Sequence, residues 1–147
     1  MRNLGTIGGN FKVIAESSFK GLNGLKSIGG DFEVNAKLFC FEYLASFEGL
    51  ENLETIGGNF KVIAGSYSSL ESLSSFKGLS GLKSIGGDFE VNAKYSSSLK
   101  SLASFEGLES LETIGGNFRV IAESYSSLNS LSSFKGLSGL KSIGGDF

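Results

Sequence analysis

The sequence predicts an all-β protein, a parallel β-solenoid of about five stacked coils with a 29-residue period and little or no α-helix. Three observations lead to this prediction. One tripeptide recurs at a nearly constant spacing. The apolar residues of each repeat follow two rhythms that no single helix or strand satisfies, and charged residues alternate in sign between equivalent positions of successive repeats.

The tripeptide Ile-Gly-Gly sets the period. Its successive spacings are 21, 28, 29, 29 and 29 residues, so the first coil is short and the later coils are regular. Residues 59–87 and 117–145 differ at three positions only, so the repeating unit is a pair of alternating coils. We expect one repeat domain over residues 1–147, and we interpret it as a piece of a longer solenoid because both ends fall inside a repeat. The expected coils cover approximately residues 8–28, 29–56, 57–85, 86–114 and 115–143.

The two apolar rhythms indicate short strands joined by bends. After each Gly-Gly the residues alternate, as in Phe89–Ala93, which is typical of a half-buried strand. Before Gly-Gly an apolar residue falls at every third position, which an α-helix would spread around its whole surface. A polygonal coil turns all of these side chains inward, and stacking buries them. We therefore expect glycines at the corners, where positive φ or close backbone approach is needed, at Gly8, Gly9, Gly21 and their equivalents.

Three columns of charge support a parallel, in-register stack. Equivalent residues of adjacent coils lie about 4.8 Å apart in such a stack, so a column of one sign would place like charges together. Alternation removes that repulsion, and a slip of one coil would restore it, so the columns are expected to fix the register. In a fourth column, Glu42 and Glu71 break the rule. The three columns are Lys12, Glu33, Lys61, Glu90 and Arg119; Lys20, Glu48, Lys77, Glu106 and Lys135; and Lys26, Glu54, Lys83, Glu112 and Lys141.

Composition argues against several classes of function. The net charge of -2 comes from interspersed acids and bases, so neither nucleic acid nor an anionic membrane is an expected partner. No apolar segment has the length of a signal peptide or a membrane span, so no membrane insertion is expected. The chain has no histidine and a single cysteine, Cys40, which excludes histidine-based triads, histidine metal sites and an internal disulfide.

Paired carboxylates could still support hydrolysis, but the charge columns already account for Glu48, Glu54 and Glu90. We therefore expect no enzyme and no cofactor. An enzyme would need a further domain outside this sequence. The Ile-Gly-Gly-Asp/Asn segments could suggest a phosphate cradle or calcium ligands at Asp31, Asp88 and Asp146. Their glycine spacing fits neither motif and asparagine fills the alternate coils, so structural corners are the preferred interpretation and no metal site is predicted.

The candidate partner-binding residues are aromatic. Tyr67, Tyr95 and Tyr125 each open a Tyr-Ser-Ser loop, and a row of loop tyrosines is typical of binding surfaces. The alternative is that these rings pack over their own coils. In the second coil the loop becomes unusually apolar and contains Phe39, Phe41 and Tyr43. Two interpretations stay open for these three residues: an interaction patch, or a plug over the core beside the short first coil.

The string Leu-x-Ser-Phe-x-Gly-Leu-x-x-Leu-x-x-Ile-Gly-Gly-Asp/Asn-Phe-x-Val, found at Leu73–Val91 and Leu102–Val120, resembles the receptor L-domain repeat. Similar repeats occur in leucine-rich-repeat-like bacterial surface proteins, where leucine often replaces this phenylalanine. The resemblance extends over essentially the whole chain. It implies a right-handed β-solenoid, usually extracellular, that recognises ligands or mediates adhesion. The family's binding surfaces are not defined by motifs, so the resemblance identifies no site residues.

Two functions follow as expectations. The first is a non-catalytic scaffold that binds a protein or carbohydrate ligand at a cell surface. The alternative is a purely structural spacer, or a solenoid that self-associates through uncapped ends. Direct head-to-tail stacking would place Lys12 against Arg119, which counts against the second idea.

Overall fold

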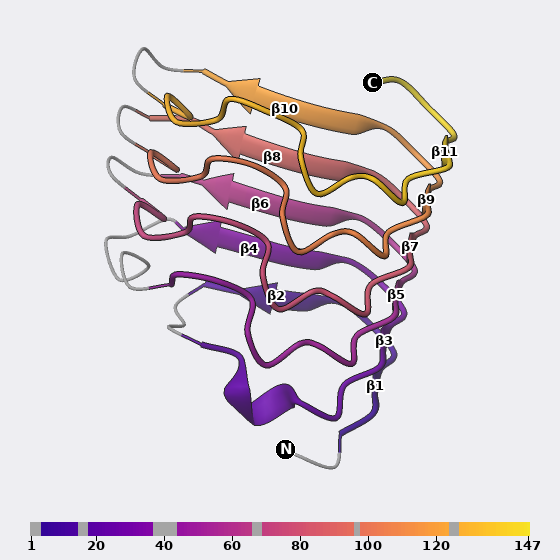
Figure 1. Cartoon of the computed structure of the whole chain (residues 1–147). Helices are drawn as coiled ribbons and strands as arrows, with labels where there is room; N and C mark the ends of the chain where they lie inside the picture. Colours follow the sequence, from indigo (N-terminus) through magenta and orange to yellow (C-terminus); the bar gives the residue numbers. More distant parts are fainter. Residues whose placement is uncertain (1–3, 15–17, 37–43, 66–68, 96–97, 124–126) are drawn as a thin grey trace.

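Two parallel β-sheets run along the sides of a column of stacked coils, which confirms the predicted parallel β-solenoid (Figure 1). The computed structural model describes residues 4–14, 18–36, 44–65, 69–95, 98–123 and 127–147. Each coil contributes one short strand to each sheet, and the remaining sides of the coil are turns and bends. No α-helix occurs among these residues, and the single helical element is the 3-10 helix η1, Lys20–Leu22.

The wide sheet has the strand order β10-β8-β6-β4-β2 and follows the Gly-Gly pairs in sequence. The narrow sheet, which has the order β1-β3-β5-β7-β9-β11, is made of two-residue strands that precede Gly-Gly. The wide-sheet strands are β2 (Phe11–Val13), β4 (Phe32–Ala36), β6 (Phe60–Ala64), β8 (Phe89–Ala93) and β10 (Phe118–Ala122). The narrow-sheet strands are β1 (Thr6–Ile7), β3 (Ser27–Ile28), β5 (Thr55–Ile56), β7 (Ser84–Ile85), β9 (Thr113–Ile114) and β11 (Ser142–Ile143).

Successive strands pair in register, so each residue lies opposite its own equivalent. In the wide sheet Glu90 lies between Lys61 and Arg119, while in the narrow sheet Ile85 pairs with Ile114. The structure makes about four turns, slightly fewer than the five coils expected. The five strands of the wide sheet enclose four complete turns, whereas the narrow sheet has six strands.

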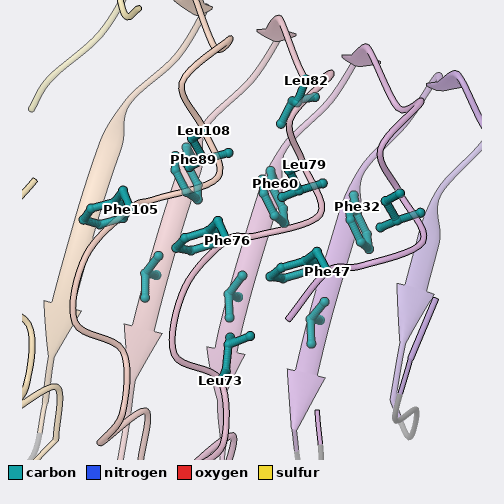
Figure 2. Close-up of a cluster of buried hydrophobic side chains, with 14 of the residues drawn as sticks. Phe32, Phe47, Phe60, Leu73, Phe76, Leu79, Leu82, Phe89, Phe105 and Leu108 are labelled. Carbon is teal, nitrogen blue, oxygen red and sulfur yellow. The ribbon is translucent and has the colours of Figure 1, made fainter. Parts of the chain in front are cut away.

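Two ladders of stacked phenylalanine rings form the core (Figure 2). In the ladder under the wide sheet, Phe60 stacks on Phe89 with ring centroids 5.1 Å apart and planes 4° from parallel. In the second ladder Phe76 stacks on Phe105 at 5.5 Å. The ladders meet edge to face, as at Phe60 and Phe76, an arrangement that the aromatic quadrupole favours. These rings and the inward leucines are fully buried, so side chains fill the interior of the described coils.

The predicted glycine corners are confirmed inside the stack. Gly78 has a φ of 108°, and a Cβ there would collide with the carbonyl group of Phe47 in the preceding coil. At Gly57 an added Cβ would collide with the carbonyl oxygen of Gly29, so the Gly-Gly pairs allow close backbone approach. The prediction was wrong for Gly8, Gly9 and Gly21 themselves, where nothing lies within 4 Å of such a Cβ. These three belong to the first coil, and no described coil lies beneath them.

Candidate functional site

Each of the three predicted charge columns contains ion pairs between adjacent coils, although not at every step. Lys77 Nζ lies 3.2 Å from Glu48 Oε1, and the equivalent pair two coils later repeats this distance. The other two columns hold pairs as well, including Lys141 with Glu112 at 3.7 Å. The side chains of the Lys77–Glu48 and Lys141–Glu112 pairs are about half exposed or more, so each of these pairs stabilises the fold only slightly. The role of the columns in fixing the register stays a prediction. The pairs in the three columns are Lys12–Glu33, Arg119–Glu90, Lys77–Glu48, Lys135–Glu106 and Lys141–Glu112.

The fourth column also contains a favourable pair. Glu71 Oε2 lies 3.3 Å from Lys100 Nζ in the next coil. The charge therefore changes from negative to positive between Glu71 and Lys100. Glu42, the residue that breaks the rule, lies outside the described residues.

The Asp and Asn residues after Gly-Gly form a hydrogen-bond ladder that sequence reasoning missed. The backbone N–H of Asp88 donates to Asn59 Oδ1 at 2.7 Å, and the N–H of Asn117 donates to Asp88 Oδ1 at 2.7 Å. In each case the side-chain oxygen accepts a hydrogen bond from the backbone of the next coil. No group of three residues able to hold a metal ion occurs among the described residues. The hydrogen bonds between successive coils support the structural interpretation of these corners. The sequence signal that could have predicted this ladder is the Asp or Asn that follows Gly-Gly in every repeat.

Of the aromatic candidates, only Tyr95 lies among the described residues. This residue is 39% exposed and lies just beyond the end of β8. Its carbonyl oxygen accepts a hydrogen bond from the N–H of Ser98 at 3.1 Å, which closes a turn. The other five candidates, Tyr67, Tyr125, Phe39, Phe41 and Tyr43, lie outside the described residues, as does Cys40.

The strand register refines the idea of a tyrosine row. Ala64, Ala93 and Ala122 are in register at the ends of β6, β8 and β10. Tyr95 is the second residue after its alanine, whereas Tyr67 and Tyr125 are the third. The three tyrosines are therefore not strictly equivalent. Tyr67 and Tyr125 share one position in alternate coils, and Tyr95 falls one residue earlier in the coil between them.

The side of the stack carries a polar groove of about 400 Å³ whose walls follow the two-coil period. Its lining includes Glu51 and Glu109, which are equivalents two coils apart, and Ser80, which holds the same place in the coil between them. The carboxylates of Glu51 and Glu109 accept hydrogen bonds from the backbone N–H groups of Gly49 and Gly107. Lys77 and Glu106 also line it. The groove offers hydrogen-bond donors and acceptors, and its lining carries both positive and negative charges.

The last coil exposes apolar side chains. Phe134 is 51% exposed and Phe147 is 75% exposed, although their equivalents inside the stack are fully buried. Both residues line a groove of about 640 Å³ together with Leu137 and Leu140. No helix among the described residues has the length and apolar character needed to cross a membrane. Comparison with protein-family models, with curated proteins and with solved structures finds no match to this chain.

Proposed function

We propose that this chain is a non-catalytic repeat scaffold that binds a protein or carbohydrate partner through its outer surface, in the manner of a cell-surface or extracellular adhesion module. The resemblance to receptor L-domain repeats and to leucine-rich-repeat-like surface proteins supports the cell-surface setting. The observation that carries the proposal is the exposure of Tyr95, just beyond the end of a strand that is paired on both sides.

A rigid support makes such a ring an effective contact residue. β8 is hydrogen-bonded to β6 and to β10, so the backbone leading to Tyr95 is fixed before any partner binds. Tyrosine supplies a large amphipathic surface with few rotatable bonds, so little side-chain entropy is lost on binding. Because phenylalanine and leucine fill the interior of the described coils, a partner must use the outside. The polar groove beside Ser80 offers a second contact area, suited to hydroxyl-rich ligands.

Replacement of Tyr67, Tyr95 and Tyr125 by serine tests the proposal. Binding of the wild-type chain is first measured on an array of glycans and purified extracellular protein domains. The triple variant should lose at least about tenfold in affinity for whatever the wild type binds, because each lost aromatic contact costs on the order of 1 kcal/mol. Its melting temperature should stay close to that of the wild type. A variant with the same three tyrosines replaced by phenylalanine keeps the rings and is the matched control. Unchanged capture by the serine variant would reject this site.

The alternative function is a structural spacer or a self-associating solenoid. The exposed rings of Phe134 and Phe147 favour it, since an apolar end is a surface for association. Against direct head-to-tail stacking, the first and last coils both carry basic residues in the three charge columns, as at Lys12 and Arg119. Light scattering over a range of protein and salt concentrations separates the possibilities. A monomer under all conditions would count against self-assembly.

A further inference from the structure

Asn23 is the one asparagine in the sequence that is followed by glycine. The backbone nitrogen of the residue after an asparagine can attack the side-chain carbonyl carbon, and a Cβ on the attacking residue hinders that approach. Glycine has no Cβ, so the Asn23–Gly24 bond offers the least hindered attack in this chain. The other asparagines are followed by leucine, alanine, phenylalanine or serine.

Asn23 lies on the outer surface of the first coil, in a tight turn. The N–H of Leu25 donates to the carbonyl oxygen of Leu22 at 2.9 Å, which places Asn23 and Gly24 at the two central positions of the turn. The same turn recurs in each later coil, and the residue equivalent to Asn23 is exposed there as well. Exposure therefore belongs to the whole column, and water can reach the Asn23 amide. The column is Asn23, Glu51, Ser80, Glu109 and Ser138.

The backbone conformation of Asn23 holds the two reacting atoms apart. Its ψ of -13° nearly eclipses the Gly24 nitrogen with the backbone nitrogen of Asn23 and turns it away from the side chain. Attack therefore needs a rotation about the Cα–C bond of Asn23, which also swings its carbonyl oxygen. That oxygen accepts a hydrogen bond of 2.5 Å from Asn52 Nδ2 in the next coil. Because this hydrogen bond restrains the rotation, Asn52 is a positioning residue that slows the attack.

We propose that Asn23 is a site of spontaneous deamidation in the folded protein, and that the hydrogen bond from Asn52 controls the rate. In the first step a bond forms between the Gly24 nitrogen and Asn23 Cγ, the Cγ–Nδ2 bond breaks, and ammonia leaves with the proton of the Gly24 N–H. One water molecule then opens the cyclic imide at either of its two carbonyl carbons. Opening between Cγ and the nitrogen gives isoaspartate or aspartate according to which carbonyl carbon the water attacks. Water is the only co-reactant.

The product changes both the charge and the backbone between the first and second coils. Asn23 is in register with Glu51, because Ser27 pairs with Thr55 and each lies four residues further along. A carboxylate at residue 23 would therefore stand next to Glu51 in the column, at the spacing of adjacent coils, about 4.8 Å. Isoaspartate also adds one carbon to the main chain, which moves the carbonyl oxygen away from Asn52 Nδ2. The modification thus loosens the contact between these coils, and it does so whether or not the outer surface binds a partner.

Tryptic peptide mapping of the full chain tests the site. Cleavage after Lys20 and Lys26 releases residues 21–26, in which Asn23 is the only asparagine. The folded chain is incubated at mildly alkaline pH, well below its melting temperature. Mass spectrometry should then show the acid product at Asn23, with isoaspartate detected by enzymatic methylation. Asn59 and Asn117 are internal controls and should stay unmodified, because each precedes phenylalanine and its Oδ1 accepts a hydrogen bond from the next coil.

Gly24→Ala should remove most of the product, because the new Cβ hinders the attack. The equivalent position carries a side chain in the acidic coils, at Asn52 and Ser110, so the turn accepts one. Similar product at Asn23 and at the two control asparagines would overturn the proposal. So would an unmodified Asn23 in the folded chain after a time in which the free peptide of residues 21–26 is converted.

Asn52→Leu tests the control of the rate. Leucine has a similar size but cannot donate, and Asn23 should deamidate about twofold to tenfold faster, because a hydrogen bond of ordinary net strength restrains the rotation by that factor. Ser110→Ala, at the equivalent place two coils later, is the matched control and should leave the rate at Asn23 unchanged. A melting curve checks that Asn52→Leu is folded, and Asn52→Asp, which also cannot donate, replaces it if it is not. An unchanged rate without the donor would show that Asn52 does not control the reaction.

Discussion

The Oδ1 atom of Asp88 accepts a hydrogen bond of 2.7 Å from the backbone N–H of Asn117, the residue that holds the same place one coil later. The same bond joins each described pair of successive corners, with aspartate and asparagine in turn. Either side chain supplies an oxygen acceptor. Asparagine in alternate coils keeps the carboxylates two coils, or about 10 Å, apart, so the ladder forms without like-charge repulsion.

Removing the hydrogen-bond acceptor at Asp88 should therefore lower the free energy of unfolding more than removing only the charge of this residue. Asp88→Ala leaves the part-buried N–H of Asn117 without its partner and should lower the free energy of unfolding by about 1–3 kcal/mol. Asp88→Asn keeps an oxygen in place and should cost less than half as much. Urea denaturation of the two variants measures the difference. Equal losses would mean that the carboxylate charge, rather than the hydrogen bond, stabilises the corner.

Gly78 gives a sharper test of the corner geometry. Its φ of 108° and the closeness of the Phe47 carbonyl leave no room for a Cβ. Gly78→Ala should lower the free energy of unfolding by about 2–4 kcal/mol, because both backbone strain and steric collision result.

The matched control is Gly21→Ala, at the equivalent place in the first coil, where the space around a Cβ is open. Its effect should stay within about 0.5 kcal/mol, as for an ordinary surface substitution. Thermal denaturation followed by circular dichroism compares the two variants. A similar loss in both variants would show that the close approach of the Phe47 carbonyl is not the cause of the loss at Gly78.

Relations between coils were predictable from the sequence, whereas several local conformations were not. The alternation of Lys61 and Glu90 fixed the expected register, because equivalent positions can be compared without knowing the path of the chain. By contrast, Leu70 and Leu99 adopt left-handed backbone conformations with φ near 50°. Leucine gives no signal for this region, which favours glycine and asparagine. Both side chains are fully buried, so the packing of the coil determines their backbone conformation.

The candidate site was harder to predict for a similar reason. Tyr95 could be named from the sequence, but its exposure depends on the direction of the backbone beyond β8, which the residue pattern does not give. The Asp/Asn ladder was visible as a column, yet its function required the positions of backbone N–H groups. The exposure of Phe134 and Phe147 contrasts with the burial of their equivalents Phe105 and Phe118 inside the stack.

The charge columns predict a salt-dependent effect at Lys77. This lysine pairs with Glu48, and Glu106 holds the equivalent place in the next coil. Lys77→Glu would align three carboxylates and should lower the free energy of unfolding by about 1 kcal/mol at low salt. Most of that loss should disappear at about 1 M salt, where charges are screened within about 3 Å. Lys77→Gln, the neutral control, should lose about half as much. A loss that does not change with salt would assign the effect to packing of the lysine stem.

Asn92 is a polar residue in an apolar position on the outer face of the wide sheet. It lies in register between Ile63 and Ile121, and only 9% of its surface is exposed. Its Oδ1 is buried and has no hydrogen-bond partner among the described residues. A carbonyl oxygen in that condition has lost its hydration without compensation, which costs on the order of 1–3 kcal/mol. At the equivalent Asn35, the Nδ2 group donates a hydrogen bond to Glu33 Oε2 at 3.2 Å.

Asn92→Ile should therefore raise the free energy of unfolding by about 1 kcal/mol, since it removes the unpaired oxygen and joins the two flanking isoleucines into a continuous ladder. Asn35→Ile should gain less or lose stability, because it breaks the hydrogen bond to Glu33 while adding a similar apolar area. Chemical denaturation of the two variants, compared with the wild type, measures both changes. If Asn92→Ile is destabilising, then the amide at this position has a partner in solution, and the alternation of isoleucine and asparagine in this column stabilises the stack just as the alternation of lysine and glutamate does beside it.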